Sequence, residues 1–139
     1  MRVLLSIKPN HVENILAGIK TFEFRRRLFT RRDVTTVVIY CTQPVGRLVA
    51  EFDIADILED DPETLWALTY FGSGISKDFY DAYFSGRDRA FALQIGELRV
   101  YEEPIFPSAW FKNFTPPQSY MYVDSEGRRI KEDAQLAFL

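Results

Sequence analysis

Hydrophobic and polar residues alternate along the chain with two different periods, and the first twenty residues show both. Residues 2–7 form a short, mostly apolar run, which is typical of a buried strand. Over residues 12–19, apolar side chains recur three or four positions apart, as on one face of a helix, and Gly18 suits the helix end. We therefore predict a strand followed by a short helix, with Asn10 and Glu13 as a capping box at its start.

The pattern then changes to the period of two that strands show. Residues 20–27 alternate, which puts Glu23 and Arg25 on one face and Phe22 and Phe24 on the other. Helices are expected to begin at Asp61, before a proline, and at Ser76. A flexible link over residues 72–76 should join these two helices. Further strands are expected at residues 34–41, 47–58, 89–101 and 118–123.

This order of elements predicts an α+β or mainly β fold. Strands with helices inserted between them suggest a mixed, partly closed β-barrel with helical covers. With 139 residues, 12 Phe and 7 Tyr, the chain can bury one substantial core. We expect one domain over residues 1–123, with residues 124–139 as a polar turn and tail packed on it or trailing it.

Charge is unevenly distributed along the chain. Net charge is only −3, yet residues 1–32 hold eight basic and two acidic residues, against nine and eighteen in the remainder. This argues against coating nucleic acid through bulk charge and leaves room for a local basic site. Alternatively, the arginines of residues 25–27 form a solvated strand end that discourages edge pairing.

Cysteine and histidine each occur once, which removes several reactions. One cysteine cannot form an internal disulfide, and no signal peptide or bilayer-spanning run is evident, so we expect a cytoplasmic protein with no membrane partner. A Cys/His zinc cluster within the chain is excluded, and we expect neither a metal nor another cofactor. A Cys41–His11 dyad is formally open, but Cys41 ends an apolar strand, where a packed structural thiol is the ordinary outcome.

The most informative chemistry is the group Lys20, Glu23 and Arg25. A lysine just past a helix end, with Glu and Arg two residues apart on a strand, brings three charges close together. The carboxylate suits base N–H groups, and the guanidinium suits phosphate or a base edge. A buried lysine beside a carboxylate could instead transfer protons. The alternative to a site is a salt bridge on a solvated face.

At these residues the sequence resembles the ASCH family, a branch of the PUA-like superfamily of RNA-associated β-barrels. The resemblance covers most of residues 1–123. Its central pattern is G-x-K-x-x-E-x-R, and the flanking pieces agree in order and spacing. The pieces are LLSIKP at residues 4–9, the central pattern at residues 18–25, VAEF at residues 49–52, AFALQI at residues 90–95 and PPQSY at residues 116–120.

The resemblance implies a cleft beside the first helix that accepts RNA or a modified nucleoside. Some ASCH proteins remove an acetyl group from acetylated cytidine with a lysine and a nucleophilic threonine three residues later. Here Lys20 matches the lysine, but Glu23 stands at the threonine position, which disfavours that mechanism. The residues expected at the cleft are Lys20, Glu23, Arg25 and Arg26, with Lys8, Ser119 and Tyr120 as weaker additions.

Our leading hypothesis is therefore an RNA- or nucleotide-binding domain, which could have a regulatory role. The alternative is a small hydrolase of a modified nucleoside or RNA, with Lys20 and Glu23 as catalytic residues. Because no histidine is expected near the site, ordinary acid–base ribonuclease chemistry is disfavoured. A second alternative is a protein-interaction barrel without a nucleic-acid ligand. Most aromatic residues are expected in the core, and Trp110, in an irregular loop, is expected to cap the barrel.

Overall fold

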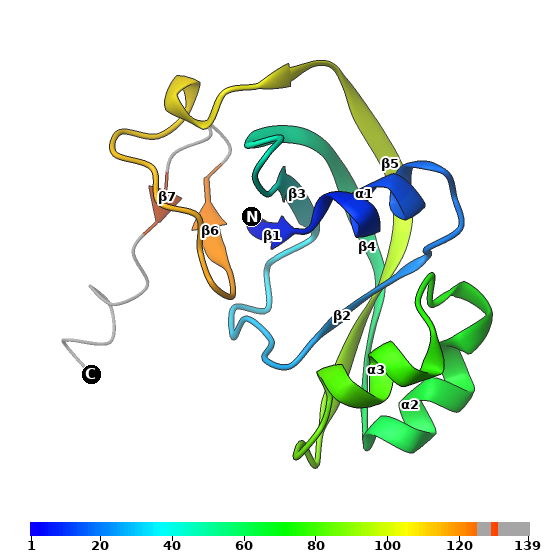
Figure 1. Cartoon of the computed structure of the whole chain (residues 1–139). Helices are drawn as coiled ribbons and strands as arrows, with labels where there is room; N and C mark the ends of the chain where they lie inside the picture. Colours follow the sequence, from blue (N-terminus) through cyan, green and yellow to red (C-terminus); the bar gives the residue numbers. More distant parts are fainter. Residues whose placement is uncertain (125–128, 131–139) are drawn as a thin grey trace, which may run out of the picture.

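The computed structural model describes residues 1–124 and 129–130 and has strands and helices in the expected order (Figure 1). Its elements are β1 (Arg2–Ile7), α1 (Pro9–Leu16), β2 (Phe22–Arg25), β3 (Thr36–Cys41), β4 (Arg47–Asp60), α2 (Pro62–Thr69), η1 (Tyr70–Gly72), α3 (Lys77–Tyr83), β5 (Ala90–Ile105), η2 (Pro107–Ala109), β6 (Met121–Val123) and β7 (Arg129–Ile130). The α+β class is confirmed.

The strands form one mixed sheet in the order β2-β5-β4-β3-β1-β6-β7. Only β1 and β3 run parallel among the described pairs. Register shifts between β4 and β5 mark irregularities that bend the long hairpin visible in Figure 1. However, β2 and β7 stay at opposite edges, and no pairing between them occurs in the described part of the chain. The prediction of a partly closed barrel is therefore wrong in one respect, because the sheet curls but does not close.

Strand β3 lies at the centre of the core, which explains why its sequence is an unbroken apolar run. All six of its residues are buried, as is typical of a strand covered on both faces. Val37 and Ile39 pack with Val12 and Ile15 of α1 in the main core cluster. On the opposite face, Val38 joins a second cluster with residues of β6. Helix α1 is thereby held against the sheet.

A third cluster packs the helical pair α2–α3 against β2 and the outer part of the β4–β5 hairpin (Figure 1). Tyr80 of α3 is fully buried there, and its hydroxyl donates to the carbonyl of Pro62 at 2.7 Å. Both predicted helix starts are confirmed, since the side chains of Asp61 and Ser76 accept from backbone N–H groups. Helix α3 therefore has a fixed position beside β2.

Other predicted boundaries need correction. Helix α1 begins at Pro9 with Lys8 as its N-cap, and no side chain caps it, so the predicted capping box of Asn10 and Glu13 is wrong. The strand expected at residues 118–123 is confined to β6. Within the expected tail, β7 pairs with β6, while residues 125–128 and 131–139 lie outside the described residues.

The link between α2 and α3 is a clamp, whereas the sequence suggested a flexible connection. Three successive backbone carbonyls of this loop accept hydrogen bonds from the α1–β2 junction. The pairs are Thr21 N–H to Gly72 at 2.8 Å, Lys20 Nζ to Ser73 at 2.8 Å and Asn14 Nδ2 to Gly74 at 3.3 Å. We call residues 72–74 the carbonyl clamp, because it joins the helical pair to the N-terminal motif.

A glycine comparison tests the carbonyl clamp. Gly74 has φ +64°, and an added Cβ would lie 2.6 Å from Cβ of Lys20, whereas Gly86 has φ +76° with nothing within 4 Å. Backbone strain should lower the free energy of unfolding of both alanine variants by about 1–2 kcal/mol. In Gly74→Ala, overpacking against Lys20 should lower the free energy of unfolding by roughly 1–3 kcal/mol more. Urea unfolding measures this difference, and equal losses in the two variants would contradict a tight clamp.

Candidate functional site

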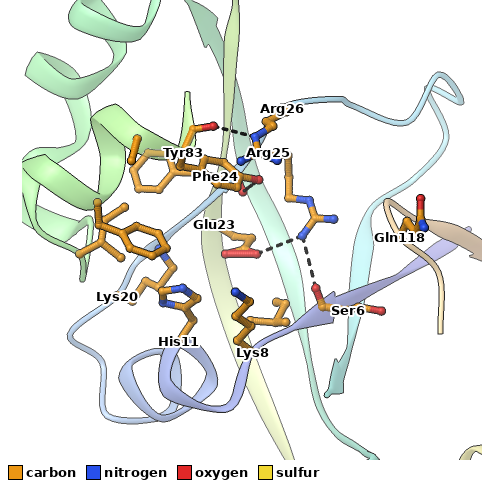
Figure 2. Close-up of a pocket in the computed structure, with 14 residues that line it drawn as sticks. Ser6, Lys8, His11, Lys20, Glu23, Phe24, Arg25, Arg26, Tyr83 and Gln118 are labelled. Atoms are coloured by element: carbon orange, nitrogen blue, oxygen red, sulfur yellow. Dashed lines mark hydrogen bonds and ion pairs between the residues drawn. The ribbon is translucent and has the colours of Figure 1, made fainter. Parts of the chain in front are cut away.

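A cavity of about 500 Å³ opens between α1, β2 and α3. This volume lies within the usual range for sites that bind small molecules. Figure 2 shows the cavity with Glu23 near its centre and Lys8 and His11 on the α1 side. The lining residues are Ser6, Ile7, Lys8, His11, Lys20, Glu23, Phe24, Arg25, Arg26, Ile75, Phe79, Ala82, Tyr83 and Gln118.

The structure brings five of the seven expected site residues to this cavity. Lys8, Lys20, Glu23, Arg25 and Arg26 all line it. Four of these side chains are cationic and one is a carboxylate, inside a protein whose net charge is negative. The local basic site expected from the first 32 residues is therefore a concave surface rather than a flat strand end.

The two remaining expected residues, Ser119 and Tyr120, do not line the cavity. Ser119 takes part through its backbone carbonyl, which accepts a 2.6 Å hydrogen bond from Arg25. The ring of Tyr120 packs edge-on against Phe29. From the same segment, Gln118 reaches the cavity instead.

Arg25 connects three parts of the fold at the cavity wall. Besides Ser119, its guanidinium donates to the carbonyl of Ser6 on β1 at 3.5 Å, and it lies 3.5 Å from the Glu23 carboxylate (Figure 2). Its shortest contact is thus to backbone, and the ion pair is long. A guanidinium used in this way fixes the distance between β2 and the segment leading into β6.

Lys20 is almost completely buried, with 3% of its surface exposed. Its ammonium donates to the Ser73 carbonyl and lies 4.8 Å from the ring centre of Phe24. Burial lowers the pKa of Lys20, and the nearby Glu23 carboxylate partly opposes this. A buried lysine tethered to a backbone carbonyl stabilises the fold and also presents positive charge to the cavity.

His11 lines the cavity, so the expectation of no histidine near the site is wrong. Its ring meets Phe79 edge-on at 5.3 Å, and its Nδ1 is buried without a hydrogen-bond partner among the described residues. Burial, and secondly the charge of Lys20, lowers the pKa of His11. A signal was present in the sequence, because His11 precedes the buried Ile15 by four positions, on one helix face.

Helix α3 supplies an aromatic wall that the sequence assigned to core packing. Phe79 is 44% exposed, and both Phe79 and Tyr83 line the cavity. Their rings are nearly parallel, at 10° and 6.5 Å between centroids. Arg26 lies 4.2 Å above the Tyr83 ring and donates to the Tyr83 carbonyl at 2.6 Å. The wall therefore combines apolar faces with a cation held in place.

Other candidate chemistry lies away from the cavity. Cys41 is buried in the main core, where burial raises the pKa of its thiol, as expected of a structural residue. Trp110 packs beside the second cluster, with Arg2 at 5.2 Å from its ring centre. Over residues 1–124 and 129–130, no group of three His, Cys, Asp or Glu side chains is arranged to hold a metal. Within the same range, no helix has the length and apolar character needed to span a bilayer.

Comparison with known proteins finds matches to the sequence and to the fold. The sequence profile of the ASCH domain matches residues 5–102. An ASCH domain-containing ribonuclease of Zymomonas mobilis is 30% identical over 129 residues, covering 88% of this chain and 84% of that protein. A crystal structure of ASCH from Zymomonas mobilis superposes with a TM-score of 0.83, 28% identity and coverage of 99% and 94%. Large ribosomal subunit protein uL22 of Ureaplasma parvum is 26% identical over 102 residues, which is 73% of this chain and 33% of that protein.

The lowered pKa of His11 gives a pH-dependent stability. As pH falls below the ordinary histidine pKa of about 6.5, the unfolded chain binds a proton before the folded one, so stability falls until the folded pKa is passed. The free energy of unfolding of the wild type should therefore decrease more than that of His11→Gln between roughly pH 7 and pH 5. Denaturant titrations across this window measure both slopes. Identical slopes would show that burial leaves His11 unperturbed.

Proposed function

The chain belongs to the ASCH domain family, and we propose that residues 1–123 bind a segment of single-stranded RNA in the cavity between α1, β2 and α3. The main support for this proposal is that Lys8, Lys20, Arg25 and Arg26 converge on one concave site with an exposed aromatic wall. Cations attract the phosphate backbone, and aromatic rings stack on bases. We also propose a cytoplasmic location, which the single, buried cysteine supports.

The four cations divide into two pairs by the exposure of their side chains. Lys20 and Arg25 donate to backbone carbonyls at 2.8 and 2.6 Å, so they maintain the cavity. Lys8 and Arg26 are exposed at its edge, although Arg26 also donates to the Tyr83 carbonyl at 2.6 Å. We assign phosphate contacts to this exposed pair and a supporting electrostatic role to the buried pair.

Lys8→Ala tests the RNA-binding proposal with little risk to the fold, because the side chain of Lys8 is exposed and does not cap α1. Loss of one phosphate contact should weaken binding and reduce the slope of log affinity against log salt by about 0.7. Fluorescence anisotropy with a labelled single-stranded RNA, at several salt concentrations, measures both quantities.

Lys112→Ala is the matched control, since Lys112 is exposed and does not line the cavity. Equal effects of the two variants would place the RNA elsewhere. Absence of binding to any RNA would instead favour a protein-interaction domain. Arg25→Ala is a poorer test, because it also removes hydrogen bonds to Ser6 and Ser119.

Cleavage of the bound RNA is the second candidate function, because the 30% identical Zymomonas protein is named a ribonuclease. In metal-independent cleavage, the 2′-oxygen attacks phosphorus and gives its proton to a general base, while the bond from phosphorus to the 5′-oxygen breaks and the 5′-oxygen takes a proton from a general acid or water. Lys20 and Glu23 remain the proposed catalytic residues, and His11 joins them as a second candidate for the proton acceptor. The lowered pKa keeps the imidazole neutral near pH 7, the form in which it can accept a proton.

A cleavage assay with His11→Gln and Glu23→Gln separates these roles. Loss of the proton acceptor should slow cleavage of labelled RNA by about 10²- to 10⁴-fold while leaving RNA affinity nearly unchanged. The variant that behaves in this way identifies the acceptor. If the wild type binds RNA and yields no cyclic phosphate product, the domain binds RNA without cutting it by this route.

A further inference from the structure

The Glu23 carboxylate has hydrogen-bonding capacity that the protein leaves unused. Only 5% of Glu23 is exposed, and burial of a carboxylate is costly unless donors satisfy it. Yet the nearest charge, on Arg25, is 3.5 Å away and directs its shorter hydrogen bond to Ser119. In the described part of the chain, no side-chain hydrogen bond reaches this carboxylate, which therefore has acceptor positions to offer a ligand.

These acceptor positions face the cavity. Among the described residues, His11 Nδ1 is the one fully buried side-chain polar atom without a hydrogen-bond partner. The Glu23 oxygens also accept no hydrogen bond, so they are not fully buried and retain access to the cavity that Glu23 lines. Figure 2 shows the carboxylate between Lys8 and His11 on one side and Phe24 and Tyr83 on the other. A ligand that enters here meets a carboxylate at the floor and aromatic rings at the wall.

We propose that the cavity takes one unstacked guanine base of the RNA and that Glu23 selects it. This inference rests on the proposed RNA binding. Guanine carries two adjacent donors on one edge, N1–H and the N2 amino group, which match the two oxygens of a carboxylate. Adenine and cytosine place an acceptor nitrogen beside their amino group, and uracil flanks its single N–H with two carbonyls, so each presents a lone pair to the negative charge.

The surroundings of Glu23 fit a purine nucleotide. The exposed face of Phe79 provides a stacking surface, while Lys8 and Arg26 lie at the cavity edge, where the phosphates of the extruded nucleotide would be. Arg25 places its positive charge 3.5 Å from the carboxylate without occupying the carboxylate oxygens. Lys8, Glu23, Arg25 and Arg26 therefore each have a role in the proposed guanosine site.

The test uses labelled heptauridylates in which the central base is guanine, hypoxanthine, adenine, cytosine or uracil. Guanine should bind roughly 10- to 100-fold more tightly than adenine or cytosine, as a bidentate base contact implies. Hypoxanthine, which keeps N1–H and lacks the N2 amino group, should be intermediate. Glu23→Gln should remove the preference, and Glu13→Gln, which changes an exposed carboxylate of α1 outside the cavity, should preserve it.

Each other outcome overturns part of this inference. Salt-dependent binding with no preference for guanine refutes base selection and leaves RNA binding standing. A preference that survives Glu23→Gln refutes the role of Glu23. Absence of binding to all five oligonucleotides refutes RNA binding itself. Should Glu23→Gln fail to fold in a thermal unfolding assay, the hypoxanthine comparison in the wild type still decides whether the N2 amino group is recognised.

Discussion

The hydrogen bond from the buried ammonium of Lys20 to the Ser73 carbonyl is the contact on which the site depends. A lysine that is only 3% exposed needs compensation for the water it has lost, and the carbonyl clamp, the Phe24 ring and the Glu23 charge provide it. In return, the clamp holds α3 against the α1–β2 junction. The wall of the cavity and the stability of the chain therefore come from the same contacts.

The arrangement of Arg25 and Glu23 places a positive charge near the carboxylate and leaves the carboxylate oxygens open to a ligand. If Arg25 donated two short hydrogen bonds to the carboxylate, the pair would be saturated and closed to a ligand. Its guanidinium instead donates to Ser119 and Ser6, and it acts on Glu23 mainly through charge at 3.5 Å. The carboxylate thereby has a positive charge nearby while its oxygens keep their capacity to accept hydrogen bonds. This division leaves the buried carboxylate open to the ligand proposed for the cavity.

Local signals in the sequence predicted much of the fold and the centre of the site. The caps at Asp61 and Ser76 and the spacing of Lys20, Glu23 and Arg25 depend on neighbours within a few residues, and the structure agrees with them. The open sheet could not be predicted, because alternation reports which face is buried and not which edges pair. Nor could the aromatic wall, since both faces of α3 carry aromatic residues and only tertiary packing exposes Phe79.

The burial of Lys20 also changes how the G-x-K-x-x-E-x-R pattern should be interpreted. Because its ammonium already donates to Ser73, loss of activity in a Lys20 variant would combine a displaced α3 with any lost chemistry. Glu23 and His11 carry no such tether among the described contacts, and they face the cavity from different elements. If Glu23 binds a guanine base, His11 can still accept the proton in cleavage, because its lowered pKa keeps the imidazole neutral. Recognition and cleavage would then reside in different side chains, so a related chain that changed one of them could keep the other.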